Sequence, residues 1–237
     1  MILAIETSTT SVGVALGRPG EILSAVRHGG KPRHGELLAP AVQLCVERAG
    51  LGMEDIEAIG VDVGPGLFTG LRVGISAAKA FGFALGRPVC ALNSLDVLAW
   101  PLRWWPGRLV AVLDGRKGQC FWASYGKSEG GWGRSGGIGA GPPQDLAEEI
   151  GRIEGEVAFV GDGALRYAGE LGAGVRGELI GDPHPGPEAA LELAAAALER
   201  GDALDAMAVQ ALYLRAPDAE VSWRVELAGP GEKGGSS

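Results

Sequence analysis

The stretch DVGPGLFTGLRVGISAAKAF, residues 62–81, has the outline of a phosphate-binding loop that runs into a helix. An apolar strand over residues 59–63 meets the loop Gly64-Pro65-Gly66, and Thr69 is placed to cap the helix that follows. A P-loop needs a lysine beside the phosphates, and this stretch has none at that position and no acidic residue after it to hold a metal. The stretch therefore predicts a strand, a tight loop and a helix, and leaves open whether the loop binds a nucleotide.

The sequence around this stretch alternates between strand and helix spacing. In the first hundred residues it predicts strands over 1–5, 12–16, 21–27 and 89–92, helices over 35–49 and 70–85, and a further helix capped by Ser94. In the rest it predicts strands over 109–113, 119–125 and 157–160 and helices over 144–150, 165–171 and 187–200, with a glycine-rich loop over 126–141. The pattern is that of two α/β units with a break near residues 100–106.

Composition and charge exclude several classes of protein. The chain has 237 residues, of which 46% are hydrophobic, so it can bury a substantial core. Its net charge of -8 argues against a general nucleic-acid binder, because such a protein needs a basic face. Basic residues cluster locally near residues 27–34 and 103–117, and solvated loop charges are the simpler interpretation of both clusters.

The cysteines and the apolar runs indicate the compartment. Cys45, Cys90 and Cys120 lie far apart and form no CxxC pair. They are therefore expected to be free thiols buried in apolar segments, which are ordinary in proteins. Glu6 interrupts the apolar start, so the N-terminus does not read as a signal peptide, and no apolar run is long enough for a membrane span. These observations predict a cytoplasmic protein with reduced thiols.

Five segments together resemble the TsaB family, also called YeaZ. They are ILAIETSTTSVGVAL (2–16), GVDVGPGLFTGLRVGISAAKAFGFAL (60–85), VLDGRKGQCFWA (112–123), VGDGA (160–164) and LYLRAPDAE (212–220). The resemblance implies an α/β, two-lobed actin and sugar-kinase-like (ASKHA) fold in which each lobe is a mixed sheet with helices. It places an N-terminal lobe at 1–100 and a C-terminal lobe at 101–226, and residues 227–237 are expected to form a disordered tail.

For the chemistry of the fold, the resemblance directs attention to the polar turn after the first strand. In this superfamily that turn reaches the phosphates of ATP, so Thr7 and Ser8 are candidate remnant nucleotide contacts, as is the loop Gly161-Asp162-Gly163. Each has a plainer interpretation: the hydroxyls satisfy the turn's own backbone groups, and Asp162 caps the helix expected near Leu165. No serine lies in a nucleophile elbow, and no catalytic residue is assigned. The resemblance implies no tightly bound cofactor, with weak or interface-dependent ATP or ADP binding left open.

A metal site is not expected either. The related catalytic subunit TsaD holds its metal with two histidines four residues apart on a helix. Here Leu38 stands four residues after His34, while His28 lies six residues before it and His184 is in a distant turn. The histidines therefore lack the spacing of a metal site.

The helix after the glycine loop carries small residues at every fourth position, namely Gly70, Gly74 and Ala78. Packing of this stripe against the chain's own sheet is one interpretation, and close approach of a partner helix is the other. The resemblance implies that this helix and the one at 35–49 meet TsaD or a second copy of the chain. The expected interface residues are Gly64, Pro65, Gly66, Phe68, Thr69, Gly70, Arg72, Gly74 and Ala78.

Three functions follow as hypotheses. The first is a non-catalytic scaffold subunit that supports TsaD and recruits the ATPase TsaE, for modification of the adenosine next to the anticodon. In that case TsaD forms a heterodimer with the chain, TsaE completes a ternary complex, the free chain is a homodimer, and tRNA is reached only through the complex. The second is an ATP-dependent phosphotransferase of the sugar-kinase type, and the third is a metallopeptidase-like glycoprotease.

Overall fold

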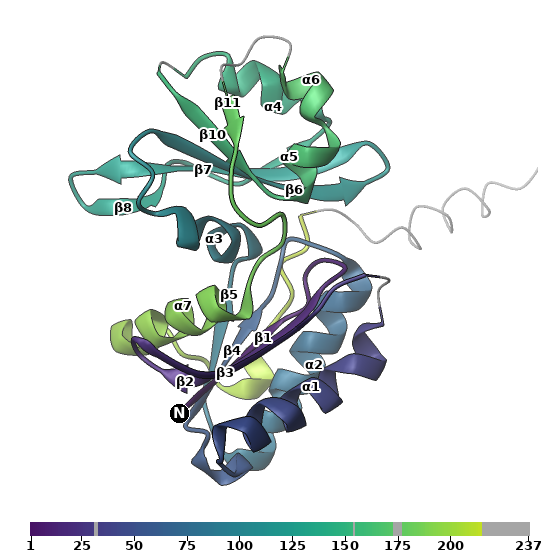
Figure 1. Ribbon diagram of the computed structural model, residues 1–237, viewed down its shortest axis with the longest axis vertical. Coiled ribbons are helices and arrows are strands. Elements are labelled where there is room, and N and C mark those ends of the chain that lie inside the picture. The colour runs from purple at the N-terminus through teal and green to yellow at the C-terminus, as the bar shows by residue number, and fades with distance from the viewer. Residues whose placement is uncertain (31–32, 154, 173–176, 215–237) are drawn as a thin grey trace, which may run out of the picture.

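Two mixed β-sheets, one above the other in Figure 1, organise the chain in the computed structural model. The structure describes residues 1–30, 33–153, 155–172 and 177–214. The strands of the first sheet are β1 (Ile2–Glu6), β2 (Val12–Arg18), β3 (Glu21–His28), β4 (Ala58–Asp62) and β5 (Val89–Leu92). Those of the second are β6 (Arg108–Arg116), β7 (Gln119–Ser128), β8 (Gly131–Arg134), β9 (Gly139–Gly141), β10 (Val157–Val160) and β11 (Gly177–Leu179).

The two sheets repeat one topology. The first has the order β3-β2-β1-β4-β5 and the second contains the order β8-β7-β6-β10-β11. In each, a three-stranded antiparallel meander is followed by two strands parallel to the first strand of the meander. This confirms the expected α/β, two-lobed actin and sugar-kinase-like fold, with a mixed sheet in each lobe.

Helices cover both faces of the first sheet. Their bounds are α1 (His34–Ala49), α2 (Phe68–Leu85), α7 (Pro187–Arg200) and the short 3-10 turns at Met53–Asp55 and Ala206–Ala208. Figure 1 shows α1 and α2 on one face and α7 on the other. The alanine-rich α7 approaches closely, because a Cβ on Gly60 of β4 would lie only 2.6 Å from the Cβ of Ala194. Buried residues on both faces give this lobe two apolar clusters.

The second sheet is covered by α3 (Ser94–Ala99) on the face toward the first lobe and by α4 (Pro143–Ile150), α5 (Asp162–Arg166) and α6 (Ala168–Gly172) on the other. Alternation along β6 divides its side chains between these layers. Leu109, Ala111 and Leu113 pack with α3, while Val110 and Val112 pack with the outer helices.

The structure differs from the expected division into lobes at 1–100 and 101–226 in two places. Leu95, Leu98 and Leu102 pack in the core of the second sheet, so the second lobe begins before residue 101. The helix α7 packs on β1, β2 and β4, and Val209 lies in the core of the first lobe. The chain therefore returns to the first lobe after β11. The expected tail at 227–237 lies outside the described residues.

Three local predictions also need correction. The glycine-rich segment 126–141 is not one loop, because it holds the end of β7 and the strands β8 and β9. The helix α2 begins at Phe68 without a side-chain cap, so Thr69 does not cap it. At α3 the capping side chain is Asn93, whose amide oxygen accepts from Leu95 N at 3.0 Å. Within the described residues, no helix has the length and hydropathy needed to span a membrane.

Candidate functional site

The polar turn between β1 and β2 is packed inside the protein. Glu6, Thr7 and Ser8 are almost fully buried. The Ser8 backbone N–H and its hydroxyl both donate to Glu6 Oε1 at 2.7 Å, and Thr7 Oγ1 donates to the carbonyl of Gly70 at 2.9 Å. The hydroxyls proposed as remnant nucleotide contacts are thus engaged by the chain itself, although their acceptors are the Gly70 carbonyl of α2 and the Glu6 carboxyl group and not, as expected, backbone groups of the turn.

A second buried carboxyl group, Asp62, ends the neighbouring strand β4. Because Ile5 pairs with Val61 in the parallel register, Glu6 and Asp62 follow side by side. Asp62 Oδ1 accepts from Gly64 N at 2.8 Å and from Ser94 Oγ at 2.5 Å. Burial and the nearby Asp62 carboxylate raise the pKa of Glu6 well above its usual range, and burial raises the pKa of Asp62. Each carboxyl group therefore keeps its proton to a higher pH than an exposed one does, and the two titrate as a coupled pair.

The Gly64-Pro65-Gly66 loop closes over this pair and is bonded to the polar turn. Gly64 has φ +114°, in the region that favours glycine, and the Gly64–Pro65 peptide bond is cis. Leu67 N donates to the carbonyl of Ser8 at 2.6 Å, and a Cβ on Gly66 would collide with the Ser8 backbone. The loop therefore directs its backbone groups to other parts of the chain, and it joins the polar turn to α2.

The small-residue stripe on α2 packs inside the first lobe. Gly70, Gly74 and Ala78 are all buried. A Cβ on Gly70 would collide with the carbonyl of Thr7, and one on Gly74 would collide with Thr7 Oγ1. The prediction that this stripe is a second surface for a partner is wrong, because the β1–β2 turn already occupies it. Gly64 and Pro65 are buried as well.

The outer side of α2 is exposed and carries the other expected interface residues. Phe68, Thr69 and Arg72 are exposed, and Gly66 is partly so. The Arg72 guanidinium lies 3.9 Å from the centre of the Phe68 ring, and Tyr213 contacts the same ring at 5.3 Å between centroids. Tyr213 belongs to the segment that returns from α7. Arg72 and Tyr213 also line a groove of about 340 Å³ between α2 and residues 209–213.

The Gly161-Asp162-Gly163 loop follows β10 in the second lobe. A Cβ on Gly163 would lie 2.7 Å from the backbone carbon of Leu113, and one on Gly161 would collide with the Val112 carbonyl, so both glycines allow close packing on β6. Asp162 is the first residue of α5, and its Oδ1 accepts from Asp114 N at 2.9 Å. The prediction that Asp162 caps a helix near Leu165 is wrong, since its carboxylate bonds to β6 instead. Burial raises the pKa of Asp162.

Asp114 lies near the end of β6, the first strand of the second meander. Its side chain is only 4% exposed and forms an ion pair with Arg116 at 3.1 Å. Tyr167 OH donates to Asp114 Oδ1 at 3.0 Å. Arg116 and Lys117 have positive φ angles of 64° and 52° in the turn after β6. The expected basic cluster over 103–117 is divided, because β6 separates Arg108 from Arg116 by the length of the strand.

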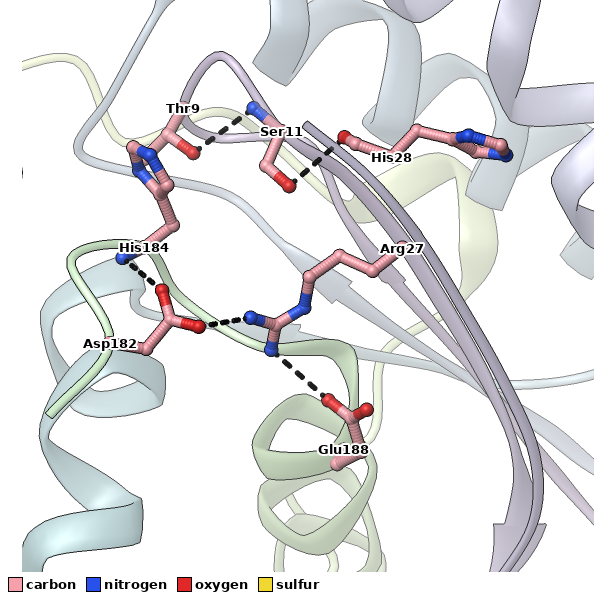
Figure 2. A network of polar contacts seen from close by, with 7 residues as sticks. All are labelled: Thr9, Ser11, Arg27, His28, Asp182, His184 and Glu188. Atoms are coloured by element: carbon pink, nitrogen blue, oxygen red, sulfur yellow. Dashed lines mark hydrogen bonds and ion pairs between the residues drawn. The ribbon is translucent and has the colours of Figure 1, made fainter. Parts of the chain in front are cut away.

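The strap between β11 and α7 is tied to the edge strand β3. Figure 2 shows Arg27 reaching from β3 to Asp182 in the strap and to Glu188 at the start of α7, at 2.5 and 3.2 Å. His184 N donates to Asp182 Oδ1 in the same strap. Of the basic residues expected to cluster near Arg27, the two described arginines are paired with acids: Arg27 with Asp182 and Glu188, and Arg33 with Glu36. Lys31 lies outside the described residues.

The histidines lie apart from one another. His34 is buried at the start of α1, where its Nε2 lies 2.7 Å from the carbonyl oxygen of Thr9, whereas His28 is on β3 and His184 in the strap. Among the described residues, no group of three or more histidine, cysteine, aspartate or glutamate side chains is arranged to hold a metal. The sequence did not reveal the buried roles of His34, Glu6 and Asp62, although the position of both acids at strand ends is a signal for them.

Comparison with known proteins adds a family to this geometry. Residues 25–132 match the family model described as TsaD, tRNA N6-adenosine threonylcarbamoyltransferase. The tRNA threonylcarbamoyladenosine biosynthesis protein TsaB of Escherichia coli is 31% identical over 166 residues, which are 68% of this chain and 71% of that protein. TsaB of Bacillus subtilis is 33% identical over 124 residues, 52% of this chain, and the match spans about half (54%) of that protein.

A solved structure extends the similarity to most of the chain. YeaZ from Pseudomonas aeruginosa superposes with a TM-score of 0.74 at 28% identity, over 90% of this chain and 99% of that one. A second Pseudomonas aeruginosa structure, described as similar to peptidase YeaZ, gives a TM-score of 0.76 at 29% identity, with the same coverage. At 90% coverage of this chain, the similarity extends over both lobes.

Proposed function

This chain belongs to the TsaB family of tRNA threonylcarbamoyladenosine biosynthesis proteins, and we propose that it is a non-catalytic scaffold subunit. It binds and supports the catalytic subunit TsaD, and with TsaD it recruits the ATPase TsaE. The complex modifies the adenosine next to the anticodon, and this chain reaches tRNA only through the complex. The site of action is the cytoplasm.

The outer side of α2 carries the proposal. Large apolar side chains are exposed there and on the adjoining segment: Phe68 is 37% exposed, Phe83 76%, Met207 61% and Tyr213 43%. Exposed apolar patches on a folded protein are typical of interaction surfaces, and an aromatic and arginine cluster such as Phe68, Arg72 and Tyr213 is typical of their energetic centre. We therefore assign the partner contact to this side of α2.

The inner side of α2 supports a rigid interface. Its glycines pack directly on the β1–β2 turn, so the helix is fixed in place before a partner arrives. A preformed surface loses little conformational entropy on binding. The same surface serves for homodimerisation when TsaD is absent, so the two associations compete.

The internal bonding of the polar turn supports a non-catalytic role. Thr7 and Ser8 donate their hydroxyl hydrogens to groups of the chain, and the Gly64-Pro65-Gly66 loop is bonded to the same turn. A phosphate would have to displace these bonds. Nucleotide binding at this turn of the free chain is therefore weak, and any ATP or ADP held there needs groups supplied by a partner.

Mixing the purified chain with TsaD from the same organism tests the proposal. Size-exclusion chromatography with light scattering should show a heterodimer that replaces the homodimer. A folded TsaD that elutes unchanged after mixing would contradict the scaffold role. An ATP-turnover assay on the chain alone is the second measurement, because robust hydrolysis or sugar phosphorylation would favour a kinase instead.

A further inference from the structure

A pocket of about 420 Å³ lies between the lobes, on the side of α3 away from the polar turns. It is lined by Asp96 and Trp100 at α3, by Tyr125, Trp132, Gly133 and Arg134 of the second sheet, and by Leu193 of α7. Asp96 and Trp100 are four residues apart and share one side of the helical segment. Leu98, between them, points to the other side, where it lies 2.8 Å from the position of a Cβ on Gly161. The pocket is therefore separate from the Gly161-Asp162-Gly163 loop.

Aromatic rings form the wall of this pocket. Tyr125 and Trp132 stack at 5.4 Å between centroids and 13° between planes, and Trp100 meets Trp132 edge-on at 6.1 Å. Tyr125 is buried beneath Trp132, and its hydroxyl donates to Asp96 at 2.7 Å, which fixes the stack. Both tryptophans are partly exposed. The pocket therefore offers aromatic rings to a planar occupant.

One polar atom of the wall has no partner among the described residues. Trp100 Nε1 donates to Glu192, and Arg134 is paired with Asp96. Trp132 Nε1 is buried but has no hydrogen-bond acceptor. A buried donor without an acceptor is unfavourable, so an occupant that presents an acceptor to Trp132 is favoured over a purely apolar one.

Charge at the pocket is balanced. Arg134 is paired with Asp96, and Arg103, which lies 4.6 Å above the Trp100 ring, is paired with Glu192. The two guanidinium groups still present further N–H donors at the rim. Recognition at this pocket therefore depends on stacking and hydrogen bonding, with a smaller contribution from net charge.

We propose that this pocket binds a purine base. A purine is planar, stacks on tryptophan, and carries ring nitrogens that accept a hydrogen bond from Trp132 Nε1. The volume lies within the range of roughly 300–1,000 Å³ that small-molecule sites have. The base comes either from a free nucleotide or from an unpaired position of an RNA strand, since both offer the same ring.

The test uses AMP at millimolar concentration, with binding followed by saturation-transfer NMR on the base protons and by tryptophan fluorescence. Trp132→Phe keeps a ring over Tyr125 and removes the N–H, so it should weaken AMP binding about five- to tenfold, as expected for one lost hydrogen bond. The matched control is Trp104→Phe, because Trp104 is 65% exposed and does not line the pocket. This control should bind AMP as the natural chain does.

Two further variants keep the test decisive. Leu193→Trp fills the pocket from α7 without changing the aromatic wall, and it should abolish AMP binding even if Trp132→Phe fails to fold. Asp162→Asn alters the loop after β10, outside the pocket, and should leave AMP binding unchanged. A single-stranded oligoadenylate compared with AMP identifies the source of the base. Tighter, salt-sensitive binding of the oligonucleotide indicates RNA, and equal affinity indicates a free nucleotide.

Several results would overturn the proposal. These are the absence of AMP binding at millimolar concentration, equal displacement of AMP by ribose 5-phosphate, and loss of binding in Asp162→Asn but not in Trp132→Phe. A Trp132→Phe variant that binds AMP normally and instead loses its association with TsaD would make the pocket a protein contact.

Discussion

Glu6 and Asp62 end two adjacent parallel strands, and their carboxyl groups form a buried pair in which burial raises both pKa values. Asp62 Oδ2 is buried and has no hydrogen-bond donor among the described residues, which favours a proton held between the two carboxyl groups. The pair joins β1, β4, the glycine loop and Ser94 of α3 through the hydrogen bonds of Asp62 and Ser8. The first lobe thus has a coupled pair of titratable groups at its centre.

The pair predicts that stability decreases as pH rises. Both pKa values are raised by folding, so the native state holds a proton that the unfolded state releases. The stabilisation is complete below the ordinary glutamate pKa of about 4.3 and is lost as pH rises through the raised value, at about 1.4 kcal/mol per pH unit for one proton. Urea unfolding from acidic to alkaline pH measures the slope.

Glu6→Gln should remove most of this slope, because the amide keeps a donor for Asp62 and an acceptor for Ser8 without titrating. Glu57→Gln is the control. That exposed carboxylate lies beside the N-terminal ammonium and its pKa is lowered, so its contribution changes only in acid. A slope in Glu6→Gln equal to that of the natural chain would show that the pair does not titrate as described.

Replacing Gly74 with leucine tests the packing of α2. Its Cβ would collide with Thr7 Oγ1 and lie 3.5 Å from Ile5, so the side chain has no space on the inner face. We expect a loss of about 1–3 kcal/mol or more in the free energy of unfolding, measured by thermal or urea denaturation. Ser76→Leu on the exposed side is the control and should melt normally. A Gly74→Leu protein as stable as the natural chain would refute the buried stripe.

Replacing Phe68 with serine tests the proposed interface. The ring contacts Arg72 and Tyr213 on the outer side of α2, so its loss should weaken binding to TsaD tenfold or more, about 1.4 kcal/mol, with little change in melting temperature. Leu165→Ser, which removes a 51% exposed apolar side chain from α5, should bind normally. Equal binding by both variants in calorimetry would place the interface elsewhere.

The three cysteines should be unreactive in the folded protein. All are free and buried, and burial raises the pKa of Cys90 to about 11 and of Cys120 to about 12. Because the thiolate is the reactive form, a thiol reagent at pH 8 should modify few sites until denaturant is added, and then all 3. Rapid modification of a native thiol would show that one of these environments opens in solution.

The isolated chain should bind tRNA weakly. Its net charge is -8, and Arg27 and Arg33 are neutralised by neighbouring acids. Filter binding across a salt series should show low affinity that falls steeply as salt rises. Tight binding that persists in high salt would mean that a basic face forms in solution.

Periodicity predicted most elements because each depends on local spacing. The strand before the glycine loop, the helices α1, α2 and α7 and the strands β6 and β7 were all indicated by apolar runs of the right period. The prediction of a loop over 126–141 was wrong because glycines in this segment conceal the alternation of apolar and polar residues that marks a strand. The strand β8 nevertheless places Trp132 on the Tyr125 ring. A hydrophobic pattern cannot indicate a strand that has few side chains.

Tertiary contacts limited what could be predicted about the site. The four-residue spacing of Gly70, Gly74 and Ala78 correctly places them on one side of a helix. Only the fold reveals that Thr7 covers that side. The local sequence likewise does not predict that α7 packs on the first lobe, since its alanines can pack closely against any neighbouring element. Whether the exposed Phe68, Thr69 and Arg72 meet a partner stays a prediction.

The close packing of α2 on the β1–β2 turn has a thermodynamic consequence. With Gly74 directly against Thr7, a displacement of the turn cannot occur without a displacement of the helix. A molecule that prefers a shifted turn and a protein that binds the outer side of α2 therefore act on one shared equilibrium. Linkage requires their effects to be reciprocal: whatever factor the partner applies to affinity at the turn, an occupant of the turn applies to affinity for the partner.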